Sequence, residues 1–115
     1  MNDNKSREEL KAQYKERKRV GGAFVIRNIV KNKLLLGVSA DLQGSKNRFD
    51  FAQNTGSCVD MKLQKDWAEQ EPHDFVFEVL DELEKGAVQT EEEFKADVKL
   101  LKEIWLEKLS GEDLY

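Results

Sequence analysis

GGAFVIRNIVKNKLLLGVSADLQGSKNR, residues 21–48, is the stretch that decides the fold of this chain. Its apolar residues predict a strand over 23–30 and a return strand over 34–36. The turn between them is expected at 31–33, because Asn32 tolerates the left-handed backbone conformation that a tight hairpin needs. A strand–turn–strand unit is therefore the first element that the sequence predicts.

A helix is expected to follow this unit. Gly37 is expected to end the second strand at a point where another group comes close to the backbone. Ser39 or Asp41 then offers an oxygen that accepts a hydrogen bond from a free N–H of the first helical turn. Gly44 weakens the helix by about 1 kcal/mol relative to alanine, so the helix over 42–53 is the least strongly indicated.

Capping boxes and apolar spacing indicate the remaining elements. One capping box predicts a helix over 7–17, and a second one at 90–93 begins a C-terminal helix that Gly111 is expected to end. A helix is expected over 60–69, and the almost continuous apolar run 75–80 predicts a strand buried on both faces, or nearly so. These elements predict an α+β fold in which three strands pack against helices. The last helix carries an apolar stripe of Phe94, Val98, Leu101, Trp105 and Leu109.

The composition is that of one small globular domain with a charged surface. The chain has 115 residues, of which 39% are hydrophobic and 37% are charged. No apolar run reaches membrane-spanning length and the N-terminus is no signal peptide, so no membrane partner is expected. The single cysteine, Cys58, excludes an internal disulfide and fits a reducing compartment, which predicts a cytoplasmic protein.

The charges are unevenly distributed along the chain. The net charge of −4 differs from that of a globally basic nucleic-acid binder. Basic residues gather in the first half, however, and this half could meet phosphate. The alternative is a set of solvated helix faces laced with opposite charges. The basic residues that a nucleic acid would meet are Lys15, Arg17, Lys18, Arg19, Arg27, Lys46 and Arg48.

Two short segments resemble the motifs of the GIY-YIG nuclease family. Gly22-Ala23-Phe24 stands where that family has GIY, and Leu35-Leu36-Gly37 stands where it has YIG. The match covers most of residues 21–109 as a pattern and an order of elements. The resemblance implies a three-stranded antiparallel sheet flanked by helices, forming a domain over 21–115 after an N-terminal helical extension over 1–20.

The resemblance also implies a catalytic site. The family cleaves phosphodiester bonds with one divalent metal, which is held by a glutamate on a late helix. Two tyrosines, an arginine and often a histidine assist, and Mg or Mn is the implied cofactor. The tyrosine positions fall on Phe24 and Leu35, the arginine on Ser45, the histidine on Phe49, and the glutamate on Glu103, or on Glu107 one turn later.

Most of these positions lack the expected functional group. Arg48 is the nearest guanidinium to the arginine position and is offset along the helix. General acid–base and electrostatic contributions are each worth on the order of 10²–10³-fold, so their joint loss predicts a domain without useful turnover. The simpler interpretation is that Phe24, Leu35 and Phe49 are core residues and Glu103 is a solvated one.

Three functions remain open from the sequence. The first is a catalytically impaired GIY-YIG-like domain that still binds DNA. The second is a protein-interaction or regulatory module on the same scaffold, because a fold does not by itself fix a function. The third is an active metal-dependent endonuclease with an altered site.

Overall fold

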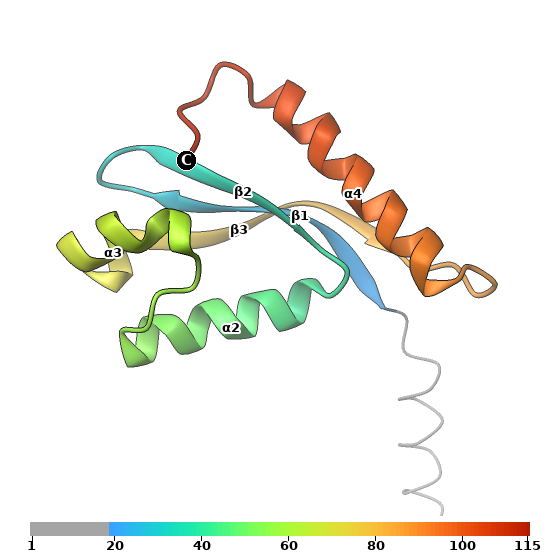
Figure 1. Ribbon diagram of the computed structural model, residues 1–115, viewed down its shortest axis with the longest axis horizontal. Coiled ribbons are helices and arrows are strands. Elements are labelled where there is room, and N and C mark those ends of the chain that lie inside the picture. The colour runs from blue at the N-terminus through green and yellow to red at the C-terminus, as the bar shows by residue number, and fades with distance from the viewer. Residues whose placement is uncertain (1–18) are drawn as a thin grey trace, which may run out of the picture.

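The computed structural model describes residues 19–115 and contains one antiparallel sheet with helices on both faces (Figure 1). The strands lie in the order β2-β1-β3, which confirms the predicted α+β fold with its three-stranded sheet. The helix predicted over 7–17 lies outside the described residues and stays a prediction. In chain order the elements are β1 (Val20–Asn28), β2 (Lys33–Ser39), α2 (Leu42–Thr55), the 3-10 turn η1 (Met61–Leu63), α3 (Gln64–Glu69), the 3-10 turn η2 (Pro72–Asp74), β3 (Phe75–Glu84) and α4 (Glu91–Lys108).

The predicted β1–β2 hairpin forms, but its bounds differ from the predicted ones. β1 covers Val20–Asn28 instead of 23–30, the turn falls at 29–32 instead of 31–33, and the second strand is longer than predicted. Asn32 has a φ of 53°, the left-handed conformation expected for the turn. β2 does not end at Gly37 and continues to Ser39, because Gly37 is the cross-strand partner of Phe24 and stays in the ladder. A Cβ on Gly37 would lie 2.6 Å from Cζ of Phe24, so a side chain of the neighbouring strand makes the close approach that the glycine predicts.

Gly22 allows the backbone of β3 to come unusually close to β1. Its φ is +155°, and a Cβ added to it would lie 2.0 Å from the carbonyl oxygen of Asp81. The register between β1 and β3 shifts between Ala23 and Phe24, which marks a β-bulge. Only glycine tolerates this combination of backbone angle and contact, which gives a structural reason for the first glycine of the motif.

Asp41, rather than Ser39, caps α2. The Oδ1 atom of Asp41 accepts a hydrogen bond from the backbone N–H of Gly44 at 3.1 Å. Ser39 Oγ instead bonds the main chain of Asp41, donating to its carbonyl at 2.8 Å and accepting from its N–H at 3.0 Å. A Cβ on Gly44 would lie 2.5 Å from Asp41 Oδ2. The glycine that weakens the helix therefore also makes room for the cap.

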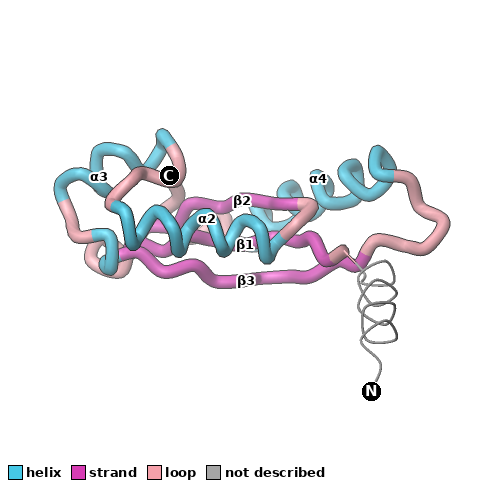
Figure 2. Tube along the Cα trace, turned by 90° about the horizontal axis from the view of Figure 1, so that it is seen from below, coloured by secondary structure: helices cyan, strands magenta, loops and turns pink. Residues whose placement is uncertain are grey.

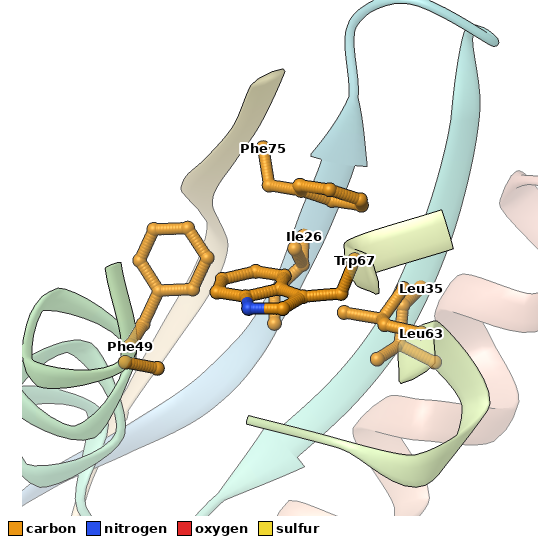
Figure 3. Packing of buried hydrophobic residues seen from close by; sticks show 7 residues of the cluster. Ile26, Leu35, Phe49, Leu63, Trp67 and Phe75 are labelled. Carbon is orange, nitrogen blue, oxygen red and sulfur yellow. The ribbon is translucent and has the colours of Figure 1, made fainter. Parts of the chain in front are cut away.

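One face of the sheet, called the α2 face from here on, is covered by α2 and α3 (Figure 2). The cluster beneath these helices combines aromatic rings with aliphatic side chains (Figure 3). The rings of Trp67 and Phe75 have centroids 4.9 Å apart, and Phe49 meets Trp67 edge-on at 6.1 Å. Aromatic pairs of this kind add about 0.5–1.5 kcal/mol beyond the area that they bury. Side-chain packing, rather than intrinsic propensity, therefore stabilises the six-residue helix α3.

The opposite face, called the α4 face, is covered by α4 (Figure 1). The predicted capping box is present: Thr90 Oγ1 accepts from Glu93 N–H at 3.1 Å, and Glu93 Oε1 accepts from Thr90 N–H at 2.8 Å. The predicted stripe turns towards the sheet, with Trp105 and Leu109 against the cluster of Val25, Leu34 and Leu36. Among the described helices, none is long and apolar enough to span a bilayer.

The prediction that residues 75–80 form a strand buried on both faces is wrong. β3 extends over Phe75–Glu84 and is an edge strand, since the sheet order places only β1 beside it. α4 packs over β1 and β2 and leaves Val76 40% exposed, while Val79 is 48% exposed on the α2 face. A run of apolar residues does not distinguish a central strand from an edge strand, and this ambiguity caused the error.

The C-terminal tail, residues 109–115, links α3 to the β1–β2 hairpin through hydrogen bonds. α4 ends at Lys108, before the predicted Gly111, and the chain then returns to pair with the outer edge of β2. The Tyr115 hydroxyl donates to Asp66 Oδ2 at 2.6 Å and accepts from Asn28 Nδ2 at 2.8 Å. Burial and the bond to Asp66 raise the pKa of Tyr115 to about 12, whereas a hydrogen bond from Lys31 lowers the pKa of Asp66.

Candidate functional site

A cleft of about 200 Å³ opens on the α2 face, between the two motif strands and α2. Phe24 of β1 and the segment 35–39 of β2 form one side of it, and Ser45 and Arg48 of α2 form the other. The loop before η1 contributes Val59 and Asp60. Three of the substituted family positions, Phe24, Leu35 and Ser45, therefore line the same cleft.

The floor of the cleft is apolar and aromatic. The rings of Phe24 and Phe77 are stacked, with centroids 4.7 Å apart and an interplanar angle of 21°. Phe24 lies on the central strand and its ring contacts both neighbouring strands, meeting Phe77 of β3 and Gly37 of β2. Both phenylalanines are only partly buried, which leaves ring surface open to the cleft.

The other two substituted positions lie in or beside the packed core. Leu35 is 6% exposed and Phe49 is 3% exposed, and both belong to the cluster beneath α2. Phe49 also packs against Phe77 at 5.8 Å and so supports the floor from below. Leu35 and Phe49 are therefore core residues, as the simpler interpretation of the sequence expects, whereas Phe24 is only partly buried and lines the cleft.

The rim of the cleft carries polar groups of both kinds. Arg48 Nη2 donates to the buried Ser45 Oγ at 3.2 Å, which leaves most of the guanidinium free towards solvent. Asp60 stands at the same cleft, and its Oδ1 accepts from the backbone N–H of Lys62 at 2.8 Å. The sequence pattern did not single out Asp60 or Phe77, because their closeness to the motif strands depends on the fold.

A second, larger groove of about 660 Å³ runs along the other flank of α2, towards β3. Arg19, Gln43, Lys46 and Asn47 line it together with the exposed side chain of Val79. Phe77 lines both depressions, so the cleft and the groove meet at this ring.

The structure divides the predicted basic residues between the two faces. Arg48, Lys46 and Arg19 line the cleft or the groove on the α2 face. Arg27 stands opposite Leu34 on the α4 face and pairs with Glu78 through bonds of 2.9 and 3.2 Å, which raise its pKa. The other three predicted residues, Lys15, Arg17 and Lys18, lie outside the described part of the chain.

Ion pairs within the domain occupy several of these cations. Arg19 pairs with Glu91, and Lys46 with Asp50 at 3.0 Å, one turn along α2. Exposed pairs of this kind are worth about 0–1 kcal/mol, so a phosphate can compete for them. Arg48 differs from these two cations, because its hydrogen bond goes to the neutral hydroxyl of Ser45 and not to a carboxylate.

Comparisons with known proteins identify the fold but not a sequence family. No protein-family model matches the sequence, and no curated protein sequence matches it either. Among solved structures, a mutant of the catalytic domain of intron endonuclease I-TevI is similar at 20% identity. Its TM-score is 0.57, over 79% of this chain and 84% of that chain. A structure of the catalytic domain of homing endonuclease I-TevI, also at 20% identity, gives a TM-score of 0.55 over 78% of this chain and 88% of that chain.

The domain has a GIY-YIG-like fold. At this level of identity the likeness concerns the fold alone, so the chemistry must be judged from the residues of this chain.

The residues of this GIY-YIG-like domain do not fit the metal that the resemblance implies. α4 carries Glu103 and Glu107, and this helix covers the face opposite the cleft (Figure 1). Both glutamates are exposed to solvent. In the described range 19–115, no three His, Cys, Asp or Glu side chains group closely enough to hold a metal ion, and Asp60 is the one carboxylate that lines the cleft.

Proposed function

We propose that this GIY-YIG-like domain binds nucleic acid across the α2 face without cleaving it. The observation that carries the proposal is the state of the cleft. It stays open beside the motif strands and presents Arg48, yet its floor consists of phenylalanine and aliphatic side chains. A phosphate can therefore be held at the rim, while no group on the floor can activate water or protonate a leaving oxygen.

The positive charge that would attract phosphate is confined to a few residues and is not a property of the whole molecule. The net charge of the chain is −4, so no long-range attraction to DNA is expected from the whole molecule. Arg48 on one flank of α2, with Lys46 and Arg19 on the other, defines a short strip of cations, in which Asp41 and Glu82 line the same groove as Lys46 and the Arg19 guanidinium pairs with Glu91 at the start of α4. We propose this strip as the phosphate-binding element, extended by Lys15, Arg17 and Lys18 from the N-terminal extension over 1–20.

A salt titration combined with a cleavage assay tests this function. Fluorescence anisotropy with labelled single-stranded and duplex DNA is expected to show binding that weakens steeply between about 50 and 200 mM salt. The same protein, incubated with plasmid and linear DNA in Mg²⁺ and then Mn²⁺, is expected to leave both substrates intact. Binding that does not depend on salt would contradict the electrostatic part of the proposal. Cleavage that disappears in Glu103→Ala would instead support an active endonuclease with an altered metal site.

A protein-interaction module is the second candidate, and a different surface favours it. α4 exposes Leu100, Ile104 and Leu106, which are 54%, 46% and 44% accessible. Leu100 and Ile104 are one helical turn apart and so lie on the same flank of the helix. Under this alternative, Ile104→Lys would abolish capture of a partner and leave DNA binding unchanged. A cytoplasmic location, in keeping with the free and exposed thiol of Cys58, belongs to both proposals.

A further inference from the structure

We infer that the cleft on the α2 face receives a single unpaired base of a nucleic-acid strand, while Arg48 contacts a phosphate next to that base. The inference rests on the proposed nucleic-acid binding and names the part of the nucleic acid that enters the cleft. The cleft could receive either a base or a backbone phosphate, and the side chains of its floor and its rim decide between these two occupants.

The floor favours a flat apolar group over an anion. Phe24 and Phe77 present partly exposed, stacked rings, and Val59 closes the cleft from the loop side. Moving a phosphate onto such a floor would remove its hydration without supplying hydrogen bonds, which is costly for a charged group. A base has a π-face and stacks on aromatic side chains whatever its identity.

The polar groups at the rim of the cleft also favour a base over a phosphate. Asp60 places a carboxylate at the cleft, and a negative charge there repels a phosphate oxygen. The same carboxylate can accept a hydrogen bond from an N–H group on the edge of a base. Arg48 lines the same cleft and has N–H donors besides the one bonded to Ser45, so the cleft offers an acceptor for a base edge and donors for a phosphate.

This arrangement selects for single strands. In a duplex, each base is stacked between its neighbours and paired with its partner, so it cannot lie on the rings of Phe24 and Phe77 without first leaving the helix. Unpaired bases of single-stranded DNA, and of RNA loops or ends, pay a smaller cost. The shared chemistry is therefore an unpaired base on a sugar–phosphate strand, from DNA or from RNA.

The experiment compares four fluorescein-labelled probes by anisotropy with the full chain. They are a 12-nucleotide single-stranded DNA, its RNA counterpart, the same DNA backbone with abasic sites throughout, and a blunt-ended 12-base-pair duplex made from the same DNA strand and its complement. If a base enters the cleft, at least one of the two single strands binds about 5- to 150-fold more tightly than the abasic strand. The duplex is expected to bind no better than the abasic strand.

Two variants and one control locate the base. Phe24→Leu keeps the floor apolar but removes a ring, and Val59→Phe fills the cleft from a partly exposed loop position without changing any charge. Each is expected to reduce binding of the base-containing strand to the level of the abasic strand. Lys46→Gln, outside the cleft, is expected to weaken both strands equally. Circular dichroism checks the folding of each variant, and Val59→Phe decides the matter if Phe24→Leu is unfolded.

Three results of these binding experiments would contradict the base cleft or the proposed nucleic-acid binding. Equal affinity for base-containing and abasic strands would contradict the base cleft and leave the proposed nucleic-acid binding intact. A base-dependent affinity that survives Val59→Phe would mean that the base is bound elsewhere, which also contradicts the inference. Failure of every probe to bind would remove the proposed function, and the inference with it.

Discussion

The two faces of the sheet carry opposite kinds of surface. The α2 face has two helices of unequal length, an aromatic core and an open cleft with polar groups at its rim. The α4 face is closed by one long capped helix, and its cation Arg27 is paired with Glu78. The difference indicates that the α4 face is closed by its helix, while the α2 face combines the larger buried cluster with an opening that we propose as the ligand site. The predictions below test this difference between the faces.

The largest expected effect is on the core of the α2 face. Phe49→Ala removes a 3% exposed ring that contacts both Trp67 and Phe77, so we expect a loss of about 3–5 kcal/mol in the free energy of unfolding. Leu109→Ala on the α4 face removes a partly buried side chain and is expected to cost roughly 1–2 kcal/mol. Urea denaturation of both variants measures the difference. Equal losses would contradict the greater importance of the aromatic cluster.

The next effect concerns the tail that fastens α3. Tyr115→Phe removes the hydroxyl that donates to Asp66 and accepts from the fully buried Asn28, which leaves buried polar atoms short of a partner at a cost of about 1–3 kcal/mol. The pKa of Tyr115 is raised from 10.0 to about 12 in the folded protein, so its contribution is fully present below pH 10 and is lost as the pH rises through about 12.

Urea titrations across this alkaline range test the tail directly. The difference in stability between the native protein and Tyr115→Phe is expected to be constant from pH 7 to 9 and to shrink above about pH 10. A difference that stays unchanged up to pH 12 would show that the hydroxyl is not the group responsible.

The smallest effect on stability is expected at the start of α4. Thr90→Ala removes the N-cap and is expected to cost about 1 kcal/mol. Hydrogen bonds with Thr90 lower the pKa of Glu93, so the capping box stabilises the helix at neutral pH and is lost as the pH falls through that lowered pKa. Thermal unfolding measures the cost, and nucleic-acid affinity is expected to stay unchanged. A loss of affinity would mean that the α4 face contributes to binding.

Local patterns predicted much of this fold. Asn32 supplied the turn, Asp41 was one of two expected caps, and Thr90 with Glu93 marked the start of α4, because each of these signals acts within a few residues. The edge position of β3 was missed, because apolar content does not reveal how many neighbours a strand has. The tail contact through Tyr115 was also missed, since it joins residues far apart in the sequence.

The site was only partly predictable for the same reason. Phe24, Ser45 and Arg48, which the family resemblance had pointed to, line one cleft. Glu103 lies on a helix over the opposite face, and the side to which a helix packs cannot be read from its own periodicity. Asp60 joined the cleft through a loop whose path the sequence did not determine.

The most direct test of the two-face account is a pair of charge-matched variants. Arg48→Gln lies at the cleft and Arg27→Gln lies on the α4 face, and each removes one positive charge. Anisotropy titrations with single-stranded DNA at several salt concentrations are expected to show weaker binding for Arg48→Gln. The salt slope is expected to be smaller by about one phosphate contact. Arg27→Gln is expected to bind as the native protein does. Equal weakening by both variants, or a larger effect of Arg27→Gln, would contradict the assignment of binding to the α2 face.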